Sequence, residues 1–184
     1  MKRLTTIALM TILAIASAHA QIRVKMTFSG TGGASPIDLK QPNSSTAEEN
    51  VAGTGTLGPF TFRDVRAVAA APQPSATCSG VFFPSPAGAG VLRFQDGSLM
   101  TVSLMQGGDC IDFVHLVGHC VLTFKVSGGT GRFKNATGVL TYTETALPVL
   151  GDVSNNPVLF TETGDITGTI SGVGSEEDSQ GGEQ

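Results

Sequence analysis

Residues 91–106 read VLRFQDGSLMTVSLMQ and contain two apolar runs separated by a turn sequence. In the second run, Met100, Val102 and Leu104 are separated by single polar residues. This period of two is typical of a strand with one buried face. Asp96-Gly97 lies between the two runs, and this dipeptide favours the tight turn of a β-hairpin. The stretch therefore predicts two antiparallel strands.

The same alternation extends in both directions along the chain. Apolar and polar residues alternate over 22–29, 122–127 and 165–171, and clusters of Gly, Pro and polar residues separate the runs. No sustained helical stripe follows residue 20. About eight or nine strands are expected, because one or two of the runs can be fused or broken. The runs are 21–30, 50–57, 59–70, 76–83, 89–95, 98–106, 110–116, 119–127, 138–146 and 158–172, with polar loops expected over 37–49 and 147–157.

Strands at this spacing must pair mostly with their sequence neighbours and bury one face, which leaves a sandwich or a closed barrel. Closure removes exposed strand edges, and 24 glycines suit a small, sharply curved barrel. An outer-membrane barrel is disfavoured because such barrels carry aromatic girdles, whereas this chain has ten Phe, one Tyr and no Trp. The sequence therefore predicts an all-β fold, a small soluble antiparallel β-barrel of about eight strands.

The two ends of the chain differ in composition from this region. Residues 1–20 are typical of a signal peptide, with basic residues first, an apolar run over 4–16 and small residues before a cut after Ala20. The apolar run is short for a membrane span, which needs about 20 residues. We therefore expect a secreted or periplasmic protein with no membrane span in the mature chain. Residues 21–174 form the predicted barrel domain, and the acidic segment 175–184 is a predicted disordered tail.

Charge and glycine patterns exclude several partners. The formal net charge is −4 and only 14% of residues are charged, so there is no electrostatic reason to expect nucleic acid or an anionic membrane. Gly53, Gly55 and Gly58 match the spacing of a dinucleotide fingerprint. However, the residues from Pro59 onward continue as a strand, and the helix that would hold the phosphate is missing. We therefore expect no cofactor.

The three cysteines, Cys78, Cys110 and Cys120, leave one thiol over if two are bridged in an exported chain. Nine residues separate Cys110 from Cys120, which fits a hairpin, so we expect this pair to be bonded. A bond between Cys78 and Cys110 is the rival pairing.

Four polar residues are candidate acid–base groups of a barrel interior. They are Asp64, Arg66, Tyr142 and Glu144. Tyr142 and Glu144 share a strand face with Leu140, and burial there would raise the pKa of Glu144 and suit it to general acid catalysis. Since charged side chains are usually exposed, we expect Tyr142 and Glu144 to point outward.

Residues 109–120 gather the histidines His115 and His119 together with Asp112. Two histidines four residues apart would share one face of a helix, as in zinc sites. On the predicted hairpin they need not converge, so a polar tip beside a disulfide is favoured. A zinc or copper site at His115, His119 and Asp112 is the alternative.

Residues 127–138 read SGGTGRFKNATG and carry a resemblance to a known family. They resemble the GGTGxFxxAxG hairpin of dirigent proteins and of the allene oxide cyclase barrel-like superfamily. The glycines allow positive φ and a close approach of the backbone in a tight connection, and the Phe can cover one barrel mouth. The residues assigned this structural role are Gly128, Gly129, Gly131, Phe133 and Gly138.

The resemblance implies a barrel of the kind found in exported bacterial proteins. In plants, the two families handle small hydrophobic or phenolic molecules inside the barrel, but their polar site residues cannot be matched to this chain. We therefore expect an exported barrel without catalysis that binds a small hydrophobic molecule or has an extracellular structural role. The alternatives are an isomerase or cyclase acting on a hydrophobic substrate inside the barrel and metal binding at His115 and His119. A structural barrel should be filled by side chains, whereas a binder needs a cavity.

Overall fold

The computed structural model describes residues 21–153 and 157–174, most of them in strands. The predicted signal peptide (1–20) and acidic tail (175–184) lie outside the described residues. The elements are β1 (Ile22–Ala34), β2 (Ser44–Gly55), β3 (Phe60–Ala69), β4 (Val81–Pro84), β5 (Ala87–Phe94), β6 (Leu99–Asp112), β7 (Val117–Gly129), the 3₁₀ turn η1 (Gly131–Phe133), β8 (Thr137–Gly151) and β9 (Pro157–Ser171).

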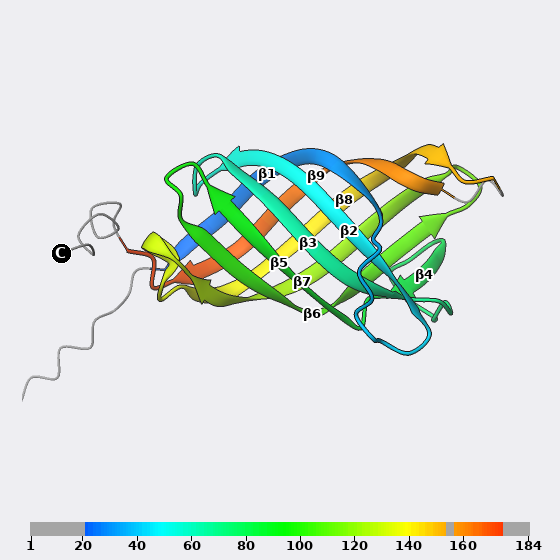
Figure 1. The fold of residues 1–184 in the computed structure, drawn as a ribbon, viewed down its shortest axis with the longest axis horizontal. Coiled ribbons are helices and arrows are strands. Elements are labelled where there is room, and N and C mark those ends of the chain that lie inside the picture. Colours follow the sequence, from blue (N-terminus) through cyan, green and yellow to red (C-terminus); the bar gives the residue numbers. More distant parts are fainter. Residues whose placement is uncertain (1–20, 154–156, 175–184) are drawn as a thin grey trace, which may run out of the picture.

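The strands form a closed antiparallel barrel, which confirms the predicted fold class (Figure 1). Eight strands follow one another in the order β6-β5-β3-β2-β1-β9-β8-β7, and pairing of β6 with β7 closes the ring. The remaining strand, β4, lies outside this ring. It pairs with residues 108–111 of β6, beyond the segment 99–103 that pairs with β5. In the described part of the chain, no helix is long and apolar enough to cross a membrane.

The predicted hairpin joins β5 to β6. Its connection spans three residues, 95–97, because the Phe94 N–H donates to the Ser98 carbonyl over 3.0 Å. Gly97 has a φ of 83°, which its lack of a side chain allows. The turn is therefore one residue longer than the dipeptide alone suggests.

Two predicted loops were wrong in part, and two predicted runs are fused, as the expected strand count allowed. The runs 98–106 and 110–116 are a single strand, β6, whose pairing with β7 shifts in register between Leu104 and Gln106. Gly107 keeps the regular register and has a φ of 136°. β2 begins at Ser44 although 37–49 was predicted as a loop, and β8 continues to Gly151. Glu49 concealed the start of β2, because its polar side chain occupies an inward position and interrupts the apolar alternation. Pro148 concealed the extension of β8, because proline is typical of loops and strand ends.

One end of the barrel is closed by η1, at the left in Figure 1. Phe133 is fully buried and its ring centroid lies 4.6 Å from that of Phe94. The Arg132 guanidinium covers both rings, at 5.1 Å from Phe94 and 4.7 Å from Phe133, and donates to the Leu57 carbonyl over 2.6 Å. In the connection and just after it, Gly128, Gly131 and Gly138 have positive φ, and a Cβ at Gly129 would collide with Leu99. These observations support the structural role expected for these residues.

The middle of the barrel is filled with side chains. Met100, Val102, Leu122, Phe124 and Val126 are buried, and Leu104 packs against them. Tyr142 stacks on Phe28 with ring centroids 4.5 Å apart. The interior is therefore solid from the closed end to the level of Tyr142.

The disulfide joins Cys78 to Cys110, and the predicted Cys110–Cys120 bond was wrong. The reason is the strand register. Cys120 pairs with Asp109, whereas Cys110 pairs with His119, so the two cysteines occupy neighbouring register positions whose side chains point to opposite faces. Cys120 is buried inside the barrel as a free thiol.

Candidate functional site

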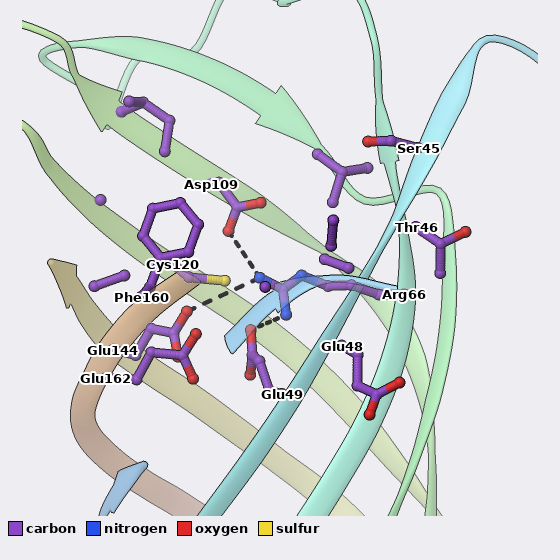
Figure 2. A pocket seen from close by; sticks show the side chains of 17 residues that line it. Ser45, Thr46, Glu48, Glu49, Arg66, Asp109, Cys120, Glu144, Phe160 and Glu162 are labelled. Carbon is purple, nitrogen blue, oxygen red and sulfur yellow. Dashed lines mark hydrogen bonds and ion pairs between the residues drawn. The ribbon is translucent and has the colours of Figure 1, made fainter. Parts of the chain in front are cut away.

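A cavity of about 270 Å³ occupies the end of the barrel opposite Phe133. Figure 2 shows side chains that line it. It lies where β1, β3, β6 and β8 end and β2, β7 and β9 begin. Its apolar lining includes Ala34, Ala47, Val68, Ile111, Ala146 and Phe160, and its polar lining includes Glu49, Arg66, Asp109, Cys120, Glu144 and Glu162.

The polar residues face inward because each continues the inward register of its strand. Phe62 of β3 is buried, and two and four residues later Asp64 and Arg66 are buried as well. Leu140 is likewise followed by Tyr142 and Glu144, which are 1% and 6% exposed. The expectation that Tyr142 and Glu144 point outward was wrong, because the sheet register overrides the general preference of charged groups for water.

Arg66 is the centre of the polar cluster (Figure 2). Its Nη1 atom donates to Glu49 Oε1 in a salt bridge, and its Nη2 atom donates to Asp109 Oδ1 over 3.1 Å. Asp64 Oδ2 and Glu144 Oε1 lie 3.7 and 3.9 Å from the guanidinium nitrogens. One guanidinium therefore holds carboxyl groups from four strands.

Tyr142 and Glu162 extend the cluster on the β8–β9 side. The Tyr142 hydroxyl donates to Glu144 Oε2 over 2.8 Å. Glu162 lies against the backbone of Gly32, at a place where any side chain on residue 32 would collide with its carboxyl group. The absence of a Cβ at residue 32 thus makes room for a buried acid.

Several buried atoms of the cluster have no hydrogen-bond partner among the described residues. They are Glu49 Oε2, both carboxyl oxygens of Asp64, Glu162 Oε2 and Arg66 Nε. Buried polar atoms in folded proteins are nearly always paired, so such a concentration marks a site that a ligand, water or proton completes.

Burial controls the protonation of the cluster. It raises the pKa of Asp64 and of Glu144, and it raises the pKa of Glu162 to about 8, with the Glu144 charge adding to the effect at Asp64 and Glu162. Burial would lower the pKa of Arg66, but the negative charges of Asp109 and its neighbours outweigh burial and raise it. The guanidinium is therefore charged at neutral pH, while some of the carboxyl groups carry protons.

Cys120 is a neutral thiol in this setting. Burial, and then the charge of Asp109, raise the pKa of Cys120 well above its ordinary value. A thiol with a raised pKa is a poor nucleophile. Cys120 therefore contributes to the cavity wall.

The histidines predicted as alternative metal ligands lie elsewhere. His115 is exposed between β6 and β7 and its Nδ1 lies 2.7 Å from Asp112 Oδ2, a contact that lowers the pKa of Asp112 to about 2. His119 lies on β7, with its Nδ1 3.3 Å from Thr145 Oγ1. The structure does not bring His119 together with the other two. Among the described residues, one group of three has its potential ligand atoms within 4.8 Å of one another, and it is formed by Glu49, Cys120 and Glu144.

Glu49 and Glu162 were not among the residues singled out in the sequence. Strand parity is the signal that identifies them, since Glu49 lies two residues from inward Val51 and Glu162 lies four from inward Ile166. Of the residues predicted as acid–base groups, all four lie in one connected cluster.

No protein-family model, curated protein or solved structure matches the chain.

Proposed function

We propose that the protein is an exported, non-catalytic barrel that binds a small molecule with an apolar body and one polar end. The observation that carries the proposal is the cavity, which combines apolar walls with a buried cluster of polar groups at its inner end. Small-molecule sites in proteins have this composition, in which apolar surface provides affinity and a few fixed polar groups set orientation.

The cavity volume indicates a small ligand. Pockets for drug-sized molecules span about 300–1,000 Å³, and about 270 Å³ lies just below that range. At about 30 Å³ for each water-sized group, the cavity has room for roughly nine heavy atoms. A short alkyl chain or a single ring with one polar substituent fits this limit.

The contrast between the two barrel ends argues against a purely structural role. Around Phe133 the interior is packed, whereas at the other end hollow space lies beside unpartnered buried atoms such as Glu162 Oε2. Stability alone favours filling such space with apolar side chains, because cavities and unsatisfied polar groups both destabilise a fold.

Export and the family resemblance remain part of the proposal. The Cys78–Cys110 disulfide is typical of proteins in oxidising compartments, which suits a secreted or periplasmic location. A closed antiparallel barrel is also compatible with the dirigent and allene oxide cyclase barrel-like resemblance of 127–138.

Native mass spectrometry of protein purified from its source tests the proposal. Wild-type protein should carry a small organic adduct, and Ala47→Phe, which fills the cavity, should lose it. Ala52→Phe is the matched control, because Ala52 lies on the same strand but is exposed. Wild-type protein that carries no adduct and takes up none from an extract of its source would contradict the proposal.

A second candidate is isomerisation or ring closure of a hydrophobic substrate, favoured by one observation. The Glu144 carboxyl lines the cavity, and burial raises its pKa, so it can remain protonated and act as a general acid. In that case a ligand incubated with the wild-type protein should be recovered as an isomer. The Glu144→Gln variant should bind the same ligand and release it without isomerisation. Recovery of the unaltered ligand from wild-type protein supports binding alone.

A further inference from the structure

We infer that the polar end of the ligand is a cation of the ammonium type, so that the ligand class is a small apolar amine. This inference rests on the proposed binding function and specifies its ligand. It follows from an imbalance of charge at the inner end of the cavity and from the kind of hydrogen-bonding atom that is left unpaired there.

The described residues in this part of the barrel include five carboxyl groups and one guanidinium. The acids are Glu49, Asp64, Asp109, Glu144 and Glu162. Four of the five are at most 6% exposed. The other titratable groups facing the cluster, Cys120 and Tyr142, supply no positive charge, and Glu48 at the cavity edge is paired with Arg63. Buried charges require a partner or a proton, and Arg66 can neutralise one of five.

Among the residues that line the cavity, the unpaired buried atoms of the cluster are two carboxyl oxygens, which accept hydrogen bonds, and one donor, Arg66 Nε. Glu49 Oε2 and Glu162 Oε2 belong to residues of the cavity lining and receive no hydrogen bond within the described structure. An ammonium group supplies three donors and a positive charge to such oxygens. A hydroxyl group would supply one donor and no charge.

An anionic ligand is disfavoured by the same contacts. Its carboxylate or phosphate would enter among five carboxyl groups, and the Arg66 Nη atoms already donate to Glu49 and Asp109. Two negative charges in contact repel each other strongly in a buried site, where water does not screen them.

A metal ion is disfavoured by the position of Arg66. Glu49, Cys120 and Glu144 approach one another closely enough to hold one, but Arg66 forms a salt bridge with Glu49 and lies 3.9 Å from Glu144. A dication there would lie next to a guanidinium. The apolar walls also suit the carbon chain of an amine and give a metal ion nothing to bind.

Protons take the place of the cation when the site is empty. Burial raises the pKa of Glu162 to about 8, and it raises the pKa of Asp64 and Glu144 as well. An ammonium group that enters must displace protons from these carboxyl groups. Binding is therefore linked to proton release, and the affinity should rise with pH.

Isothermal titration of the disulfide-bonded chain with n-octylamine, 1-octanol and octanoate tests the inference. The amine and the alcohol have nine heavy atoms each, and the acid has ten. We expect octylamine to bind at least about tenfold more tightly than octanol, as one charged hydrogen bond implies, and octanoate not to bind. Octylamine affinity should rise by more than about tenfold between pH 6 and pH 8, with proton release seen as a buffer-dependent heat.

Two variants make the test specific to the cluster. Glu162→Gln should retain octanol binding. Its preference for octylamine over octanol should fall about tenfold, because the substitution removes a carboxyl group from the cavity lining. Asp165→Asn makes the same carboxyl-to-amide change on an exposed residue of the same strand and should leave the preference intact.

The outcomes distinguish an error in the ligand class from an error in the binding function. Octanol or octanoate binding as tightly as octylamine would overturn the inference and leave the binding function standing. Failure of all three ligands to bind would contradict both. Zinc binding that depends on Cys120, without octylamine binding, would replace the amine with a metal.

Discussion

Arg66 determines the electrostatics of the open end of the barrel. It forms a salt bridge with Glu49 and donates a hydrogen bond to Asp109, and two further carboxyl groups lie within 4 Å of it. Moving charges out of water is unfavourable, and a buried ion pair recovers that free energy only when its partners are well matched. A single cation among the five acids described here does not achieve this, so protons on some of them, such as Glu162, are part of the folded state at neutral pH.

This excess of acids makes the free energy of unfolding depend on pH. The pKa of Glu162 is about 8 in the folded protein and near 4.5 in an ordinary setting. Between these values the folded protein binds more protons than the unfolded chain, so the free energy of unfolding should fall as pH rises from 5 to 8, by a few kcal/mol at ~1.4 kcal/mol for each unit of pKa shift. Urea unfolding at pH 5 and pH 8 measures the change.

The variants at Glu162 and Asp165 identify the origin of this pH dependence. Glu162→Gln should flatten the fall in unfolding free energy, whereas Asp165→Asn should keep it. The window begins at pH 5 because Asp112, whose pKa is lowered to about 2, is ionised throughout it in both states. An unfolding free energy that stays constant or rises between pH 5 and pH 8 would show that the buried acids are ionised in the folded protein.

At the scale of the element, strand parity explains both what the sequence predicts and what it conceals. β7 alternates strictly, with Leu122, Phe124 and Val126 inward, and such strands are recognised directly. β2 was recognised only from residue 50, because Glu49 occupies an inward position that a hydrophobic pattern assigns to a core residue. The segment of β2 that was missed in the sequence thus supplies Glu49 to the site.

The candidate site was predictable in part for the same reason. Extending the inward register from Phe62 reaches Asp64 and Arg66, and extending it from Leu140 reaches Glu144. Their convergence around one guanidinium depends on the order in which strands join around the barrel, which is a property of the closed sheet. The sequence of a single strand carries no information about that order.

Gly138, the second residue of β8, allows a separate test of the close approach between β8 and β9. Gly138 has a φ of 152°, and a Cβ there would come 2.8 Å from the Ile170 Cα and collide with the Thr169 carbonyl of β9. Gly138→Ala should therefore lower the free energy of unfolding by about 3 kcal/mol or more, since it adds an overlap to the backbone strain. Denaturant unfolding of the variant and the wild type provides the comparison.

Gly97→Ala is the matched control for this substitution. Gly97 also has positive φ, 83°, but a Cβ there meets no atom within 4 Å. It should lower the unfolding free energy by only about 1 to 2 kcal/mol, the contribution of backbone conformation alone. Equal losses in the two variants would mean that β8 and β9 can separate to admit a methyl group.

For the whole molecule, the two ends of the barrel are stabilised in different ways. Packing of Phe133 and Phe94 under Arg132 closes one end. At the other end, the interior is a cavity among charged groups, and the Cys78–Cys110 bond joins the segment before β4 to β6. A covalent link at the hollow end compensates for the contacts that a packed core would provide.

Removal of this disulfide should therefore destabilise the protein strongly and weaken its binding site. Cys110 is adjacent to Asp109, which accepts a hydrogen bond from Arg66, and the bonded cysteines are 32 positions apart in the sequence. A loop of that length corresponds to about 3 to 4 kcal/mol of stabilisation. The variant Cys78→Ser/Cys110→Ser should lose about this amount of unfolding free energy in denaturant unfolding and bind octylamine less tightly.

Thiol titration of the denatured, unreduced protein checks which cysteines are paired. The wild type should show one thiol and Cys120→Ala none, whereas two thiols in Cys120→Ala would mean that Cys120 is a bonded cysteine.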